Sequence, residues 1–176
     1  MRHRGLVYRA HNPYWSFSPL SGEGARQDGG RFNPKGTAAL YTSLTETVAL
    51  AEYHQGFPRR PQPATLCAYE VDCADIADLT DAATRSALHV QETDLSCPWE
   101  WLVGIGQQPP SWVLAARLIQ QGLAGIVVPS FAVNAPPNGK NLVFWRWDNV
   151  LPHQVVLIDD DERLPRNQES WQGEGE

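Results

Sequence analysis

The 176-residue chain has few of the residues that would tie it to a metal or to an oxidising compartment. Its three cysteines, Cys67, Cys73 and Cys97, are odd in number and lack the paired spacing of zinc sites. We therefore expect reduced, buried thiols in a cytoplasmic protein. The five histidines are scattered, without an HExxH or similar motif, so no metal is expected.

Long apolar runs and an excess of positive charge are also missing. No stretch is long enough to cross a membrane, and residues 1–4 lack the apolar segment of a signal peptide, so we expect no membrane association. Lys and Arg number 14 against 20 Asp and Glu, and the formal net charge is −6. Because a nucleic-acid surface needs a basic face, we expect no direct contact with nucleic acid.

What the chain does have is the composition of one globular domain. Hydrophobic residues make up 42% of it, enough for a sizeable core. The last stretch, from residue 159 onward, is charged and lacks apolar periodicity. We therefore expect a single domain over residues 1–158 and a flexible charged tail over residues 159–176.

Short apolar segments separated by turn residues predict a mixture of strands and helices. Strands are expected at residues 6–9, 38–42, 65–72, 125–130, 142–147 and 154–158, with a helical fragment at 82–88. Residues 11–37 are expected to form a long ordered loop without regular structure. Ser111 is expected to cap a helix over residues 111–121, which Gly122 would end. The pattern favours an α+β fold with a split or mixed sheet.

Another helix is expected to follow the second strand. Ser43 and Glu46 match a capping box, which predicts a helix from there to about Gln55 and assigns Glu46 a structural role. Glu52 lies on this helix beside its apolar stripe. A carboxylate in that position either reaches solvent or faces a cleft.

Residues 29–36 (Gly-Gly-Arg-Phe-Asn-Pro-Lys-Gly) are the densest cluster of unusual residues. Gly29 and Gly30 allow backbone angles that other residues avoid, and Pro34 stiffens one point, so we expect a shaped loop that holds Arg31 in place. A guanidinium on a rigid loop suits bidentate capture of a phosphate or carboxylate. The alternative is a tight surface turn whose arginine sits in water.

An ordered series of motifs runs through most of the chain. It comprises Val-Tyr-Arg at 7–9, Ser-Gly-Glu-Gly-Ala at 21–25, Gly-Gly-Arg-Phe-Asn-Pro at 29–34, Leu-Tyr-Thr-Ser at 40–43, Ala-Leu-Ala-Glu at 49–52, Val-Pro-Ser at 128–130 and Asn-Leu-Val at 141–143. In this order the motifs resemble the RES-domain family of toxins, named for arginine, glutamate and serine. The series is far more specific than any one of its pieces.

The resemblance implies a fold similar to the ADP-ribosyltransferase toxins, with a split mixed β-sheet, flanking helices and NAD+ bound as substrate in a cleft between the halves of the sheet. It also implies a toxin–antitoxin pair in which a separate protein neutralises the toxin. Both Arg9 and Arg31 fit the arginine of the family. Its tyrosine, glutamate and serine match Tyr41, Glu52 and Ser130.

These residue types suit cleavage of NAD+ at the nicotinamide–ribose bond. The nicotinamide is already a cationic leaving group that needs no proton donor, so one carboxylate, Glu52, can stabilise the oxocarbenium-like ribose. Tyr41 can offer a flat face to the nicotinamide, and either arginine can pair with the pyrophosphate. Ser130 and Asn141 would position ribose or amide groups by hydrogen bonds.

These residues are compatible with three functions. The expected one is an enzyme that transfers ADP-ribose from NAD+ to water or phosphate. A protein ADP-ribosyltransferase would use the same site with a macromolecular acceptor. A non-catalytic module would instead dock a partner through the aromatic residues at 14–17. We further expect the antitoxin to block the cleft formed by Arg31, Tyr41 and Glu52.

Overall fold

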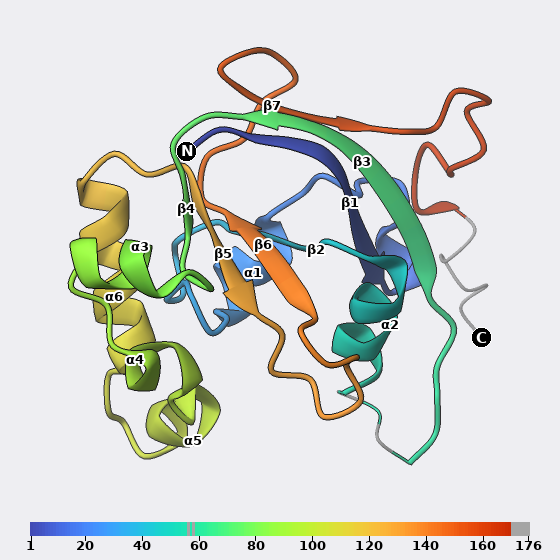
Figure 1. Ribbon diagram of the computed structural model, residues 1–176. Helices are drawn as coiled ribbons and strands as arrows, with labels where there is room; N and C mark the ends of the chain where they lie inside the picture. The colour runs from blue at the N-terminus through green and yellow to red at the C-terminus, as the bar shows by residue number, and fades with distance from the viewer. Residues whose placement is uncertain (56, 58, 170–176) are drawn as a thin grey trace.

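The computed structural model describes residues 1–55, 57 and 59–169, in which seven strands form one mixed sheet with flanking helices (Figure 1). The strands are β1 (His3–His11), β2 (Leu40–Ser43), β3 (Thr65–Cys73), β4 (Ile76–Asp78), β5 (Gly125–Pro129), β6 (Lys140–Phe144) and β7 (His153–Leu157). The helices are η1 (Pro13–Trp15), α1 (Glu23–Asp28), α2 (Glu46–His54), α3 (Ala82–Ala87), α4 (Glu92–Ser96), α5 (Trp99–Gly104) and α6 (Pro110–Gln120). The predicted α+β class is confirmed.

The sheet is split near its middle. Its order is β4-β5-β6-β2-β1-β3-β7, with β4 and β5 parallel and all other neighbours antiparallel. Every residue of β1 pairs with β3, whereas a single described pair, Tyr8 with Ser43, joins β1 to β2. The halves β4-β5-β6-β2 and β1-β3-β7 therefore meet at a narrow seam, as the resemblance implied.

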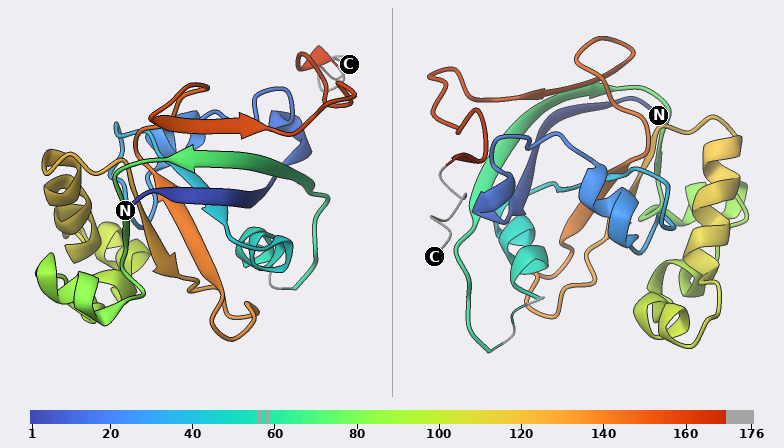
Figure 2. Two further views of the ribbon diagram at one scale, coloured as in Figure 1. Left: turned by 45° about the horizontal axis from the view of Figure 1, so that its top comes forward. Right: turned by 180° about the vertical axis from the view of Figure 1, so that it is seen from behind.

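Two apolar clusters form, one on each face of the sheet, because successive strand residues face opposite sides, and the first of them joins the two halves. Leu142 and Phe144 of β6 belong to the first cluster, with Val7 and Tyr69 of the strongly curved β1–β3 pair. Val143, between them, belongs to the second cluster, which includes the apolar sides of α4 and α6. Figures 1 and 2 show α3 to α6 grouped beside the β4 edge, with α2 on the opposite side of the sheet near β1.

The start of α2 differs from the prediction. Its N-cap is Thr45, whose hydroxyl oxygen accepts a hydrogen bond from the N–H of Val48, and Glu46 is an exposed first helical residue. Ser43 instead completes β2 and donates its hydroxyl to Asn141. The predicted capping box is therefore wrong, because the strand continues through Ser43 and its side chain finds a partner across the sheet.

The start of α6 also differs. Pro109 is its N-cap and Pro110 its first helical residue, where the missing N–H is tolerated. Ser111 lies buried inside the helix, and its hydroxyl oxygen accepts a contact from the thiol of Cys97 at 3.3 Å. The Ser111 cap is therefore wrong. Gly122 follows the helix with a φ of 89°, the left-handed geometry that favours glycine, so the predicted end is confirmed.

Residues 11–37 are more regular than expected, because they contain η1 and α1. The prediction of a loop without regular structure was wrong, since helices of three and six residues are too short for an apolar period to show. The strand expected at 142–147 also ends earlier, at Phe144. After Phe144, the N–H groups of Trp145 and Arg146 both donate hydrogen bonds to the carbonyl of Ala124.

The sequence also made predictions about the cysteine thiols and the C-terminal end of the domain. The predicted buried, unbridged state of Cys67, Cys73 and Cys97 is confirmed. Leu164 packs against the first apolar cluster, while residues 170–176 lie outside the described chain, so the boundary at residue 158 stays a prediction. Among the residues described, no helix combines the length and the apolar character that a membrane span needs.

Candidate functional site

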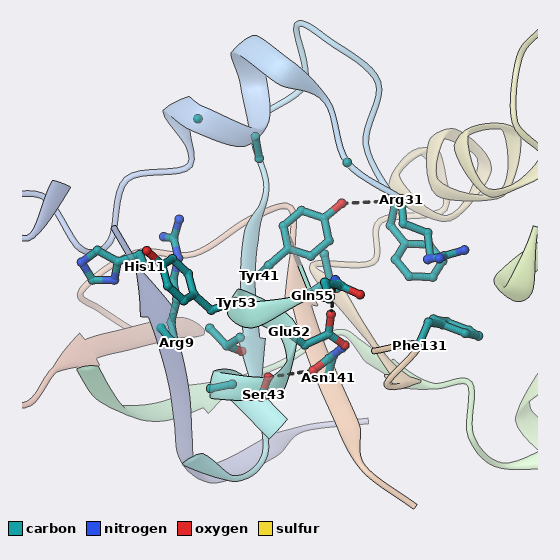
Figure 3. A pocket seen from close by; sticks show the side chains of 18 of the residues that line it. Arg9, His11, Arg31, Tyr41, Ser43, Glu52, Tyr53, Gln55, Phe131 and Asn141 are labelled. Carbon is teal, nitrogen blue, oxygen red and sulfur yellow. Dashed lines mark hydrogen bonds between the residues drawn. The ribbon is translucent and has the colours of Figure 1, made fainter. Parts of the chain in front are cut away.

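A cleft of about 1070 Å³ opens at the seam between β1 and β2. Its walls come from β1, α1, β2, α2, α5, the glycine loop at residues 29–32 and the neighbouring ends of β5 and β6 (Figure 3). Beyond Tyr8, β1 continues with β3 alone, which leaves the gap beside β2. The volume reaches the upper end of the usual range for small-molecule and cofactor sites, about 300–1,000 Å³.

Glu52 extends from α2 into the middle of this cleft. Its Oε1 accepts hydrogen bonds from Ser130 Oγ at 2.6 Å and from Asn141 Nδ2 at 2.5 Å. Its Oε2 accepts one from Gln55 Nε2 at 2.8 Å. The structure thus brings together three of the side chains predicted from the sequence. Glu52 and Asn141 line the cleft, while Ser130 contacts Glu52 from the end of β5.

Two residues of this network were not predicted for the site. Ser43 Oγ donates to Asn141 Oδ1 at 2.7 Å, which turns the amide NH₂ of Asn141 toward Glu52. Ser43 and Asn141 are directly opposite each other in the β2–β6 register, and no local sequence pattern predicts that pairing. Gln55 could have been found, because it lies three residues after Glu52 on a helix and therefore on the same face.

Tyr41 connects the cleft to the glycine loop. Its hydroxyl accepts a hydrogen bond from the N–H of Phe32 at 2.9 Å and donates to Asn33 Oδ1 at 2.6 Å. Asn33 is buried, and its Nδ2 donates to main-chain carbonyls at 2.7 and 2.8 Å. A Cβ atom at Gly30 would lie 2.5 Å from the Tyr41 hydroxyl, so this position needs glycine. Burial raises the pKa of Tyr41, which keeps the hydroxyl protonated as a donor.

Replacing Tyr41 with phenylalanine is expected to lower the free energy of unfolding by about 1–3 kcal/mol, because it leaves a main-chain N–H and a buried amide oxygen unpaired. Urea denaturation measures the change. Tyr53→Phe is the matched control, since the Tyr53 hydroxyl donates only to the exposed carbonyl of Pro63 and its loss should have a smaller effect. Equal stability of wild type and Tyr41→Phe would show that the hydroxyl does not hold the loop.

The two predicted arginines lie at different ends of the cleft (Figure 3). Arg9 Nη1 donates to the carbonyls of Pro19 and Ser21 at 3.0 and 3.1 Å. Arg31 Nη1 donates to the carbonyl of Cys97 at 2.7 Å, and its guanidinium lies 4.4 Å from the ring centre of Phe131. Arg31 is therefore held in place, as predicted, and is not the solvated arginine of a surface turn.

Neither arginine has an ion-pair partner among the described residues. Their hydrogen bonds go to neutral carbonyls, so the positive charge of Arg9 and Arg31 is not compensated by a neighbouring carboxylate in direct contact. Burial lowers the pKa of both guanidinium groups, which is the physical cost of desolvating a cation. Desolvated cations that line a cleft are suited to an anionic ligand.

His11 is a further polar residue of the cleft, at the Arg9 end, and sequence reasoning missed it. The side chain is 7% exposed, and neither ring nitrogen has a hydrogen-bond partner within the described chain. Burial, reinforced by the positive charge of Arg9, lowers the pKa of His11 to about 4. Its place two residues after Arg9, on the same side of a strand, was the available signal.

The comparisons with known proteins agree with this architecture. A family model described as the RES domain matches residues 6–167. Among solved structures, the crystal structure of the M. tuberculosis MbcT–MbcA toxin–antitoxin complex contains a chain with a TM-score of 0.64 and 21% sequence identity. The match covers 90% of this chain and 84% of that one, and it confirms the predicted fold. No curated protein matches the sequence at a significant level.

Proposed function

The chain belongs to the RES-domain family, and from that premise we propose that it is a toxin that cleaves the nicotinamide–ribose bond of NAD+. The observation that carries the proposal is the Glu52 carboxylate, held by three donors in the middle of a cleft that has, toward either end, an arginine without an ion pair among the described residues. NAD+ offers the matching charges, an anionic pyrophosphate and a ribose that becomes cationic as its bond to nicotinamide breaks.

In the proposed reaction, the bond between ribose C1′ and the nicotinamide nitrogen breaks, and its electron pair goes to the nitrogen. Nicotinamide leaves as a neutral molecule, so no general acid is needed. Glu52 stabilises the positive charge that develops on the ribose, either directly or through a ribose hydroxyl. Water or phosphate then forms the new bond at C1′, and the attacking oxygen loses its proton to solvent when water is the acceptor.

The side chains around Glu52 hold it for this role. Ser130, Asn141 and Gln55 supply three hydrogen bonds that restrict the carboxylate to one orientation, and Ser43 orients the Asn141 amide in turn. Such preorganised groups lose little freedom when the transition state forms. We assign the ring of Tyr41, which lines the cleft between its two ends, to the nicotinamide.

Each arginine fixes Nη1 on main-chain carbonyls. Because the two lie at different ends of the cleft, we assign the pyrophosphate to one of them, Arg9 or Arg31. Alanine in place of the arginine that binds the pyrophosphate is expected to raise KM for NAD+ by about tenfold, the effect of losing one charge-assisted hydrogen bond, and comparing Arg9→Ala with Arg31→Ala identifies it. Lysine should restore only part of the affinity, because an ammonium lacks the fork geometry. Steady-state kinetics with circular dichroism as a folding check measure both effects.

Arg26→Ala is the matched control for these variants. Arg26 is exposed and paired with Glu23 on α1, outside the cleft, so its removal should leave KM unchanged. Unchanged kinetics in both Arg9→Ala and Arg31→Ala would show that neither arginine binds the dinucleotide.

We also propose that a separate antitoxin blocks this cleft in the cytoplasm. Arg9 and Arg31, which form no ion pair among the described residues, suit an acidic or carboxylate-ended segment of a partner. Trp101, 62% exposed and among the residues that line the cleft, offers the large apolar contact typical of protein interfaces. The MbcT–MbcA structure is itself a toxin–antitoxin complex with a chain of this fold.

Incubation of the purified protein with NAD+, in buffer with and without phosphate, tests the enzymatic proposal. Release of nicotinamide without any added protein supports cleavage of NAD+ with water or phosphate as acceptor. Release only when a macromolecular acceptor is added would assign a protein ADP-ribosyltransferase. Absence of release under all these conditions would refute both and favour a non-catalytic binding module.

A further inference from the structure

His11 presents a buried polar ring to the cleft without a partner in the described protein. Buried polar side chains are almost always hydrogen-bonded, so an exception requires an explanation. Within the described residues, neither Nδ1 nor Nε2 of His11 has a hydrogen-bond partner, although the residue is only 7% exposed, and His11 belongs to the wall of the cleft. A ligand in the cleft would supply the missing partner.

The position of His11 places the missing hydrogen-bond partner next to Arg9, on the side away from Glu52. Residues two apart on a strand face the same side and are separated by about 6.6 Å. Figure 3 shows His11 with Arg9 and Tyr53 at one end of the cleft, away from Glu52 and Asn141. A dinucleotide with its scissile ribose at Glu52 and its pyrophosphate at Arg9 would therefore extend its adenosine half toward His11.

The charge state of the ring also favours adenosine over a second phosphate. Burial and the neighbouring Arg9 lower the pKa of His11 to about 4, so the imidazole is neutral at pH 7. A neutral imidazole offers one donor and one acceptor. This pair matches ribose hydroxyls or the edge of a purine, which both donate and accept, and does not attract an anion.

We infer that His11 is a specificity-determining residue that hydrogen-bonds the adenosine half of NAD+, next to the pyrophosphate at Arg9. The inference rests on the proposed function, because it takes NAD+ as the substrate. It adds that the cleft distinguishes the dinucleotide from nicotinamide mononucleotide, which has the same scissile bond but no adenosine.

The test compares His11→Phe, which keeps a ring of similar size without nitrogens, with His11→Gln, which keeps a donor and an acceptor. Calorimetry measures the affinity for ADP-ribose and for nicotinamide mononucleotide, and kinetics measure KM and kcat for NAD+. His11→Phe should weaken ADP-ribose binding and raise KM for NAD+ by about tenfold, the effect of one lost hydrogen bond. Affinity for the mononucleotide and kcat should stay unchanged.

His11→Gln should recover part of the lost affinity, and it replaces the phenylalanine variant if that variant fails to fold. His54→Phe is the control, because His54 lies on α2 outside the residues that line the cleft and should change nothing. Unchanged ADP-ribose affinity in His11→Phe, or an equal loss for the mononucleotide, would overturn the inference.

The outcomes separate this inference from the proposed function. Wild-type cleavage of NAD+ with a kinetically silent His11→Phe would refute the role of His11 alone. ADP-ribose binding that depends on His11, without any nicotinamide release, would refute the reaction and leave the adenosine contact in place. A wild-type protein that neither cleaves NAD+ nor binds ADP-ribose would refute both.

Discussion

Replacing Glu52 with glutamine is expected to lower kcat for NAD+ cleavage by about a hundredfold to a thousandfold, the usual effect of removing one transition-state electrostatic contact. The amide oxygen can still accept hydrogen bonds from Ser130 and Asn141, so the contacts between α2, β5 and β6 should persist. What is lost is the negative charge opposite the ribose. Release of nicotinamide by the purified variant measures the rate, and thermal unfolding verifies the fold.

Glu46→Gln is the matched control, because it makes the same chemical change on the same helix. Glu46 is an exposed residue in the first turn of α2 and is not part of the network around Glu52. We expect wild-type kinetics for it. A folded Glu52→Gln variant that cleaves NAD+ at close to the wild-type rate would remove Glu52 from the catalytic centre and with it the proposed mechanism.

Expression of the wild-type chain without a partner is expected to arrest bacterial growth. An enzyme that drains the NAD+ of its host removes a cofactor on which the host depends, and nothing in the proposed chemistry limits turnover once NAD+ enters the cleft. Growth curves and intracellular NAD+ concentrations after induction measure the effect. Growth should continue and NAD+ should stay high when Glu52→Gln is expressed at the same level.

Harmless expression of the active wild type would refute its role as a toxin. The placement of the antitoxin has its own test, in which the toxin–antitoxin complex is titrated with NAD+ and the partner segment is located by mutation. If the partner blocks the cleft, Arg31→Ala and Trp101→Ala should weaken the complex, and NAD+ should compete with it. A complex that binds NAD+ as well as the toxin alone does would show that inhibition acts from elsewhere.

The sequence by itself determined the class of the fold, most of its strands and the family. These features are encoded locally, because apolar alternation predicts a strand wherever it occurs, and an ordered series of motifs identifies a family without any contact being known. The six side chains predicted for the site were found in the same way. Five of them line the cleft, namely Arg9, Arg31, Tyr41, Glu52 and Asn141.

Only the tertiary structure determined which of these side chains contact one another and how far each is buried. Ser43 was assigned to a helix cap, yet its hydroxyl bonds Asn141, 98 positions away, because the register of β2 and β6 sets them opposite each other. Register depends on how whole strands pack, and a local pattern does not contain it. The same holds for His11, whose ring nitrogens lack a partner within the described residues, since burial depends on packing between segments distant in sequence.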